Sequence, residues 1–357
     1  MSKKRIDAVR LQLQKENLDG LVVTHLDHIR YLSGFTGSAA LLIITPKTAE
    51  FFTDFRYIDQ AAKQVKGAKR NIITTDLMTS VKDIKNLNLK HGVYGYSSEY
   101  LTVGKLKQFQ DTLSNVHLVE ANDMFTELGW VKDEEEIDNI SKAVAIGDVA
   151  FERVLNIVKP GLREREIAAE LEFQMMMLGS EKPAFETIIA SGYRSAMPHG
   201  IASDKKVQKG DFITFDFGAT VNGYVSDMTR TIVIGKATPK QKKIYNIVLK
   251  AQKASIRKIK AGVNGRLVDA AGRNIITKAG YGKNFGHGTG HGIGYFVHVG
   301  PNLSPRVDVK LKVNNVVTVE PGIYISGWGG VRIEDDVVVT KTGGRVLNKA
   351  EKKLLEL

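Results

Sequence analysis

Cysteine is absent from the 357 residues of this chain. Disulfide bridges, thiolate metal ligands and thiol nucleophiles are therefore excluded, and any metal must be bound through nitrogen and oxygen atoms. Long apolar runs are missing too: the longest, residues 39–44, is too short to span a bilayer, and the charged N-terminal region lacks the apolar segment of a signal peptide. We therefore expect a cytoplasmic protein that does not enter a membrane.

The composition is that of an ordinary globular protein, with 43% hydrophobic and 25% charged residues, and the length exceeds what one hydrophobic core usually organises. The net charge of +12 is compatible with nucleic-acid binding, but the basic residues are scattered in pairs such as Lys205-Lys206 and Lys242-Lys243. We therefore expect two domains of unequal size and no nucleic-acid partner.

Residues 1–122 alternate short apolar runs with amphipathic stretches. Ile6, Val9 and Leu13 recur at helical spacing, whereas residues 21–23 and 41–44 have the length and composition of buried strands. This alternation predicts an N-terminal α/β domain, in which we find no spacing typical of a catalytic site.

Residues 123–357 contain two similar halves. Each half begins with a long helix that carries a capping sequence, Asp133-x-x-Glu136 in the first and Thr238-Pro239-x-Gln241 in the second. A shorter amphipathic helix follows in each half, and Leu267, Ala271 and Ile275 mark the apolar face of the second one. The pattern predicts an α+β domain with an internal pseudo-twofold repeat.

Each half then supplies a pair of strands. The first pair covers residues 212–218 and 224–234, and the second covers residues 316–325 and 331–339. Apolar and polar residues alternate in the first strand, so Asp216 faces away from its apolar side.

The strand pairs bring acidic residues together. Asp227 lies on the partner strand of Asp216, and the sequence Val221-Asn222-Gly223 between them suits a hairpin turn. In the second half, Glu320 and Glu334 occupy the corresponding places. The two halves thus contribute two carboxylates each.

Four such carboxylates would repel one another and raise each other's pKa unless cations lie among them. Two divalent ions would neutralise the set, to which His291 adds one imidazole nitrogen. Oxygen donors with one nitrogen suit manganese, cobalt, iron or zinc better than copper. The predicted metal ligands are Asp216, Asp227, His291, Glu320 and Glu334.

The glycine-rich segment 286–294 is the second strong feature, because alternating glycines let the backbone approach a ligand. Its glycines do not fit a phosphate-binding loop. His287, His291 and His298 recur within or just after it, which favours a functional role, and Pro198 precedes a further histidine, His199. No G-x-S-x-G or H-E-x-x-H motif supports a serine hydrolase or a single-zinc protease.

At these residues the chain resembles, over essentially its whole length, the Xaa-Pro aminopeptidase and prolidase branch of the pita-bread metallopeptidases. The segments that carry the resemblance are 195–200 (SAMPHG), 216–218 (DFG), 226–231 (SDMTRT), 287–292 (HGTGHG), 320–322 (EPG) and 330–335 (GVRIED). The resemblance implies a creatinase-like N-terminal α/β domain over residues 1–122 and a pita-bread catalytic domain over residues 123–357. It also implies a homodimer, two divalent ions, manganese before cobalt or zinc, and peptide substrates with proline at the second position.

The resemblance implies roles for the metal ligands. Asp216 would bind one ion and His291 the other, whereas Asp227 and Glu334 would complete and bridge the two sites. Glu320 would bind metal and act as the general base.

The resemblance also implies roles for three further histidines. His298 would hydrogen-bond the developing oxyanion or the substrate carbonyl, His199 would contact the leaving-group side, and His287 would support the substrate pocket. The chain departs from its relatives at Val299, which follows His298 where they generally have glutamate.

The function expected is that of an Xaa-Pro aminopeptidase, with the Xaa-Pro dipeptidase, or prolidase, as the alternative. Two more remote alternatives share the fold: a creatinase-type hydrolase that works without metal, and a non-catalytic RNA-binding protein. The complete ligand set argues against both, since a protein that does not use metal has no need for it.

Overall fold

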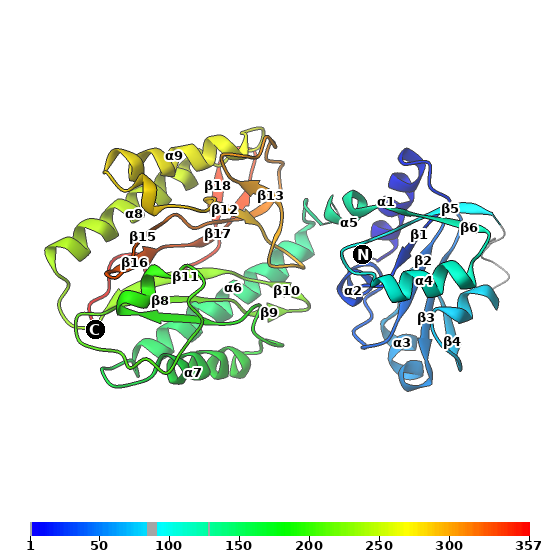
Figure 1. Cartoon of the computed structure of the whole chain (residues 1–357), viewed down its shortest axis with the longest axis horizontal. Helices are drawn as coiled ribbons and strands as arrows, with labels where there is room; N and C mark the ends of the chain where they lie inside the picture. Colours follow the sequence, from blue (N-terminus) through cyan, green and yellow to red (C-terminus); the bar gives the residue numbers. More distant parts are fainter. Residues whose placement is uncertain (1, 84–90, 128) are drawn as a thin grey trace. The chain divides into compact units, whose positions relative to one another are not determined.

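The structure is a computed structural model that describes residues 2–83, 91–127 and 129–357. It divides into two compact units, Met1–Leu128 and Gly129–Leu357 (Figure 1). The division lies slightly beyond the boundary expected after residue 122, because helix α5 (Asn122–Glu127) falls in the first unit. There, the Asn122 side chain accepts a hydrogen bond from the Ser98 backbone N–H at 2.9 Å. Among the described residues, no helix is long and apolar enough to cross a membrane.

The first unit is a mixed sheet accompanied by helices. Its elements are α1 (Ser2–Lys15), β1 (Gly20–Val23), α2 (Leu26–Ser33), β2 (Leu41–Ile44), β3 (Ala49–Asp54), η1 (Phe55–Tyr57), α3 (Ile58–Gln64), β4 (Lys69–Ile73), η2 (Thr79–Asp83), β5 (Gly92–Tyr96), α4 (Val103–Thr112) and β6 (Val116–Glu120). The strand order is β4-β3-β2-β1-β5-β6. The two predicted strands are β1 and β2, and Ile6, Val9 and Leu13 form the buried face of α1. The predicted α/β class is confirmed.

The second unit contains the two predicted halves. The first half comprises α6 (Glu134–Leu155), α7 (Glu164–Met177), β7 (Ile188–Ser191), η3 (Gly192–Ala196), β8 (Phe212–Phe217), β9 (Thr220–Val221), β10 (Tyr224–Val225) and β11 (Met228–Val233). The second comprises α8 (Pro239–Lys258), α9 (Gly265–Lys278), η4 (Gly282–Asn284), β12 (Gly290–Gly292), β13 (Val299–Leu303), β14 (Val316–Val319), β15 (Gly322–Ile325), β16 (Gly329–Arg332), β17 (Asp335–Val339) and β18 (Gly344–Val346). Each half thus presents two helices followed by strands, as Figure 1 shows.

The helix starts agree with the capping sequences. Asp133 and Glu136 form a complete capping box at α6, and Thr238 and Gln241 form one at α8. The apolar face predicted for α9 is wrong by one residue. Val268, Gly272 and Ile276 are buried there, whereas Leu267 is 48% exposed, because the helix packs on α8 through a close contact at Gly272.

The strands of the second unit are shorter than predicted. β8 pairs with β11 and β14 pairs with β17, both antiparallel, but residues 224–225 form a separate hairpin with β9, and β15 pairs with β16. The breaks fall at the acidic residues. Pro321 has no N–H with which to continue the ladder of β14, and the Asp227 N–H donates to the side-chain oxygen Oδ2 of Asp336 on β17, at 3.0 Å, rather than to a backbone carbonyl.

The turn predicted at residues 221–223 is confirmed as the tip of the β9–β10 hairpin. Asn222 and Gly223 have φ angles of 50° and 82°, the left-handed values that a tight hairpin turn of this type requires. The predicted alternation in β8 is also confirmed, since Ile213, Phe215 and Phe217 belong to the hydrophobic core under α6 and α7.

Candidate metal centre and active site

The acidic residues lie at the ends of the paired strands, where the chain leaves the ladder. Asp216 is on β8, Asp227 directly precedes β11, Glu320 directly follows β14, and Glu334 directly precedes β17. His291 is the central residue of β12, which pairs with β14 through Gly292. Both strand pairs therefore direct their acids to one place.

All the predicted site residues line one cavity of about 800 Å³. That volume is within the usual range for a small-molecule site. The lining includes the predicted ligands Asp216, Asp227, His291, Glu320 and Glu334, and the predicted catalytic histidines His199, His287 and His298.

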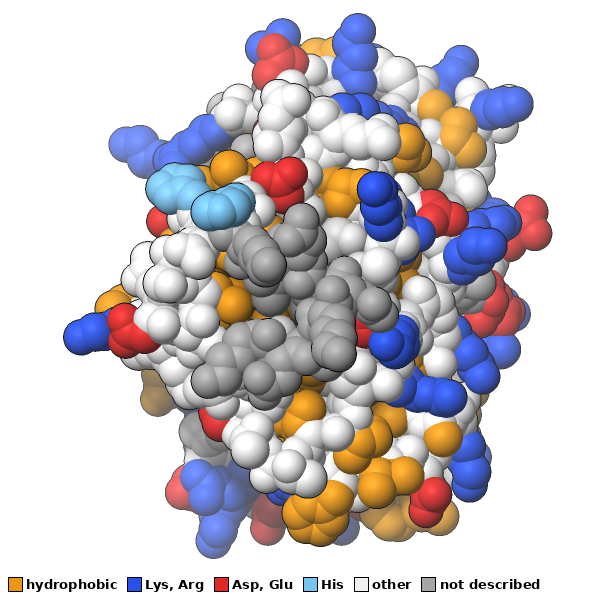
Figure 2. Space-filling model, turned by 90° about the vertical axis from the view of Figure 1, so that its right-hand side faces the viewer, with side chains coloured by type: hydrophobic (Ala, Val, Ile, Leu, Met, Phe, Trp, Pro, Cys, Tyr) orange, Lys and Arg blue, Asp and Glu red, His pale blue; other side chains and the backbone are white. Residues whose placement is uncertain are grey.

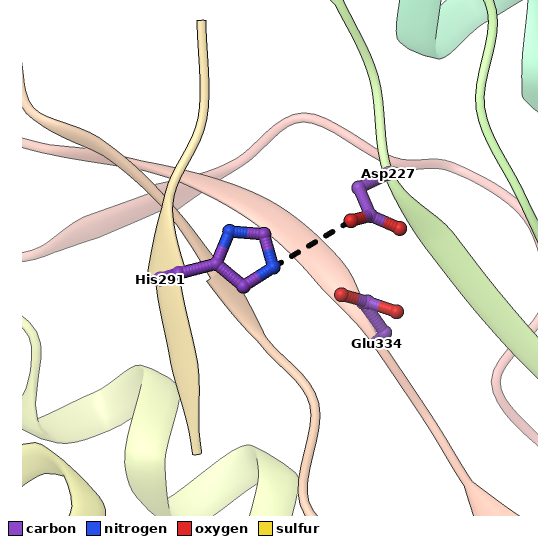
Figure 3. A group of neighbouring side chains, drawn as sticks. All are labelled: Asp227, His291 and Glu334. Carbon is purple, nitrogen blue, oxygen red and sulfur yellow. Dashed lines mark ion pairs between the residues drawn. The ribbon is translucent and has the colours of Figure 1, made fainter. Parts of the chain in front are cut away.

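Three of the predicted ligands form the tightest group. One ligand atom each from Asp227, His291 and Glu334 lies within 4.8 Å of the other two. Figure 3 shows the imidazole of His291 on β12 pointing toward the two carboxylates, which come from the starts of β11 and β17. His291 Nε2 is 3.7 Å from Asp227 Oδ2 and 3.7 Å from Glu320 Oε1.

A backbone hydrogen bond fixes the tautomer of His291. Its Nδ1 lies 3.0 Å from the carbonyl oxygen of Gly292, so Nδ1 carries the proton and donates it. Burial, followed by the neighbouring His298, lowers the pKa of His291 to about 4, so the ring is neutral near pH 7. Nε2 therefore presents a lone pair to the carboxylates, as a metal-binding imidazole does.

Burial and mutual repulsion disfavour the charged forms of the carboxylates of the centre. Burial, followed by the charge of Glu334, raises the pKa of Asp227, and burial, followed by the charge of Glu320, raises the pKa of Glu334. Burial also raises the pKa of Glu320 to about 8, although Arg332 opposes the shift. Several buried oxygens and an imidazole lone pair that face one another fit divalent metal ions.

Asp216 is held by a buried arginine that sequence reasoning missed. Arg332 Nη2 donates to Asp216 Oδ2 at 2.5 Å, Nη1 to Tyr324 Oη at 2.9 Å, and Nε to Thr229 Oγ1 at 2.9 Å. Thr229 Oγ1 in turn donates to Glu334 Oε2 at 2.6 Å. One guanidinium thus links the carboxylates of both halves.

His287 belongs to the same network. Its Nδ1 donates to the Gly288 carbonyl at 2.7 Å, so Nε2 accepts a hydrogen bond from Tyr324 Oη at 2.9 Å. Its Nδ1 is 3.9 Å from Glu320 Oε2. His287 therefore sits beside the predicted general base, with its proton placement fixed by the backbone.

The other two histidines approach the cavity from separate segments. The rings of His298 and His291 have centroids 4.3 Å apart. Val299, the departure noted above, pairs through its backbone with Gly292, so β13 positions His298 beside β12. His199 is exposed and lies on the segment that follows β7.

The site residues that were not predicted from the sequence differ in whether the sequence indicates them. Arg332 lies two residues before Glu334 and Thr229 two residues after Asp227, a spacing that places side chains on one side of a strand. Tyr324 and Arg306, an exposed arginine that lines the cavity, have no such local signal. Their places depend on tertiary packing.

Comparison with known families agrees with this architecture. The model described as metallopeptidase family M24 matches residues 138–341, and the creatinase/prolidase N-terminal domain model matches residues 5–128. The chain belongs to metallopeptidase family M24. The predicted combination of a creatinase-like α/β domain with a pita-bread domain is thereby confirmed.

Individual relatives match this M24 peptidase over nearly its whole length. An Xaa-Pro dipeptidase of Pyrococcus horikoshii is 38% identical and is aligned over 96% of each chain. The structure of an Xaa-Pro dipeptidase from Bacillus anthracis is similar with a TM-score of 0.96, 42% identity and 100% coverage of both chains. That of an X-Pro aminopeptidase from Thermotoga maritima has a TM-score of 0.89, 38% identity and coverage of 96% and 98%.

Membership of the family carries two plain consequences. This M24 protein is a peptidase, a hydrolase of peptide bonds, and it works with divalent metal ions. The Asp227–His291–Glu334 group, which could hold such an ion, lies in the part of the chain matched by the M24 model, residues 138–341.

Proposed function

We propose that the protein is a dinuclear metal-dependent exopeptidase that hydrolyses the bond before proline in Xaa-Pro dipeptides. The observation that supports it best is the convergence of four carboxylates and a deprotonated imidazole nitrogen on one cavity. The named relatives act on Xaa-Pro substrates, and the match to them extends over both units.

Asp216, Asp227, His291, Glu320 and Glu334 would hold two ions, for which manganese is the first choice and cobalt or zinc the alternatives. These ions would lower the pKa of water and polarise the scissile carbonyl. Arg332 keeps Asp216 oriented, and Thr229 does the same for Glu334.

The side chains of this chain supply the proton transfers and the alignment. Glu320 would take a proton from the attacking water and give it to the leaving proline nitrogen. His298 would donate a hydrogen bond to the carbonyl oxygen as its charge develops, and His199 would contact the leaving-group side. His287, oriented by Gly288 and Tyr324, would support the pocket next to Glu320.

Arg306 favours the dipeptide as substrate. It is exposed and lines the cavity together with Asn302 and Ser304. A dipeptide carries its free carboxylate one residue beyond the scissile bond, and a guanidinium pairs well with a carboxylate. A longer peptide would present an amide there and lose this interaction.

The Xaa-Pro aminopeptidase is the second candidate, because a structural neighbour with 38% identity has that name. The deciding assay compares Xaa-Pro with Xaa-Pro-Yaa peptides in the presence of manganese. Faster release of Xaa from the dipeptide supports the dipeptidase, and faster release from the tripeptide supports the aminopeptidase.

His291→Ala and a chelator test the metal dependence. We expect both to abolish Xaa-Pro hydrolysis, and we expect added manganese to restore only the chelated enzyme. Full activity in the variant would contradict the proposal, and activity in metal-free protein would favour the creatinase-type alternative.

Salt-sensitive RNA binding without peptide hydrolysis would instead favour the RNA-binding alternative. Figure 2 shows one face of the molecule, on which basic side chains are interspersed with acidic and apolar ones. We propose no nucleic-acid partner. The homodimer and the cytoplasmic location stay predictions.

A further inference from the structure

Residues 191–203, which run from the last residue of β7 into the connection to β8, carry His199 and form part of the cavity wall through Pro198 and Ile201. His199 is exposed, and among the described residues the structure gives its ring no hydrogen bond. Its place over the cavity therefore depends on how the segment itself is held.

Both ends of this segment are bound to one carboxylate, that of Glu164 in the first turn of α7. Glu164 Oε1 accepts from the backbone N–H of Ser191 at 2.7 Å and from its hydroxyl at 2.8 Å. Glu164 Oε2 accepts from the backbone N–H of Ser203 at 3.1 Å and from its hydroxyl at 2.6 Å. The Glu164 side chain is 0% exposed, so water does not compete for these bonds.

An arginine extends the same contacts to the middle of the segment. Arg194 forms an ion pair with Glu164, and its Nη2 donates to the carbonyl of Ile201 at 2.7 Å, two residues beyond His199. In the part of the chain that the structure describes, every hydrogen-bond donor to the Glu164 carboxylate thus lies within residues 191–203. A carboxylate that only stabilised α7 would form its hydrogen bonds within that helix, whereas those of Glu164 go to residues 191–203.

The second half of the unit contains a corresponding arrangement. Asp269 on α9 is 1% exposed, and its Oδ1 accepts from the backbone N–H of Thr289 at 3.1 Å and from its hydroxyl at 2.9 Å. Arg273 pairs with Asp269 and donates to the carbonyl of His287 at 2.6 Å. Each half therefore has a buried helix carboxylate with an arginine partner that holds a histidine-bearing segment.

We propose that Glu164 is a positioning residue that fixes the segment 191–203 and so aligns His199 with the substrate. The inference rests on the proposed function for its catalytic consequence. The hydrogen bonds that define it are independent of that function.

The substitution Glu164→Gln keeps the size of the side chain but puts an amide donor where the serine and arginine donors point. We expect kcat/KM for an Xaa-Pro dipeptide to fall on the order of 10- to 100-fold, because small misplacements of a positioned group cost about that much. Metal content should not change. Glu166→Gln is the matched control, since Glu166 lies in the same helix turn but its carboxylate accepts, among the described residues, only from the Arg163 backbone N–H, at 2.7 Å.

A double-mutant cycle separates alignment of His199 from general stability. If Glu164 acts through His199, Glu164→Gln has little further effect on kcat/KM in a His199→Ala background. An equal loss in both backgrounds, or no loss in the wild-type background, overturns the proposal.

Limited trypsin digestion, with cleavage after Arg194 followed by mass spectrometry, tests whether Glu164 holds residues 191–203 in place. This measurement does not depend on peptidase activity. We expect faster cleavage in Glu164→Gln than in wild type or Glu166→Gln, and an unchanged rate overturns the proposal even if the protein hydrolyses no Xaa-Pro peptide. If Glu164→Gln does not fold, Ser203→Ala replaces it in both experiments, because it removes one donor to Glu164 and leaves the carboxylate in place.

Discussion

Hydrogen bonds from imidazole N–H groups to backbone carbonyls fix the tautomers of two histidines of the centre. His291 and His287 each donate from Nδ1 to the carbonyl of the following glycine, which leaves both Nε2 atoms as acceptors. The two rings then have different roles. The Nε2 lone pair of His291 faces carboxylates, whereas Nε2 of His287 accepts a hydrogen bond from Tyr324. The residue after each histidine thus takes part through its backbone, which explains why glycine is tolerated there.

Arg306 is a second single residue whose role can be tested, that of binding the carboxylate of the dipeptide substrate. We expect Arg306→Ala to raise KM for an Xaa-Pro dipeptide about 10-fold or more, since a charge-assisted hydrogen bond is worth about 1.5–3 kcal/mol. KM for an Xaa-Pro-Yaa peptide should change little. Steady-state kinetics on both substrates measure the difference, with exposed Arg345→Ala on β18 as the control. Equal changes for the two substrates would show that Arg306 does not recognise the dipeptide carboxylate.

At the scale of elements, the long helices α6 and α8 begin at complete capping boxes and support the strands that carry the acids. Glu136, a member of the α6 box, also accepts from Tyr224 Oη at 3.0 Å and so connects the helix to β10, just before Asp227. The helix start and the position of that hairpin are therefore coupled.

The capping box predicts a measurable stability change. Asp133→Ala removes the acceptor of the Glu136 backbone N–H, 2.9 Å away, and we expect the free energy of unfolding to fall by about 1 kcal/mol. Asp138→Ala on the exposed face of α6 is the control, because its ion pair with Lys142 contributes only about 0.3–0.5 kcal/mol. Denaturant unfolding monitored by circular dichroism gives both values. A loss for Asp133→Ala no greater than that of the control would contradict the capping role.

At the scale of the whole molecule, metal binding and folding should be linked. Removal of the metal leaves buried carboxylates beside one another, so we expect chelation to lower Tm by on the order of 5–10 °C and manganese to restore it. Asp227→Asn should reduce the shift because it removes a carboxylate from the Asp227–His291–Glu334 group. Differential scanning calorimetry with and without manganese measures the effect, and an unchanged shift in the variant would place the stabilising ion elsewhere.

Lys132 gives the stability a pH dependence. Its side chain is buried, Nζ donates to the Trp130 carbonyl at 3.3 Å, and burial lowers the pKa of Lys132 to about 7, with Glu136 opposing the shift. Above pH 7 the unfolded chain binds a proton at Lys132 that the folded chain does not. This group therefore makes the folded state more stable as pH rises from about 7 toward the ordinary lysine value.

The measurement is the free energy of unfolding of wild type and Lys132→Met between pH 6 and 10. We expect the stability of wild type to rise relative to that of the variant over this range, whereas exposed Lys142→Met should leave the pH profile parallel to wild type. Parallel curves for Lys132→Met as well would mean that Lys132 keeps its proton in the folded protein.

Features that depend on local spacing can be predicted from the amino-acid sequence alone. Period-2 alternation identifies the face of β8 that carries Asp216, capping pairs locate the starts of α6 and α8, and the repetition of two acids per half predicts a metal centre. These patterns can be found in the sequence because residues two to four positions apart share a face whatever the rest of the chain does.

Contacts between residues far apart in the sequence become visible only in the folded structure. Arg332 and Asp216 are separated by 116 positions, and Glu164 and Ser203 by 39. The buried face of α9 and the places where the predicted strands break were likewise set by packing partners and by side chains that capture backbone N–H groups. No local period encodes such partners, because they come together only when segments far apart in the sequence pack against one another.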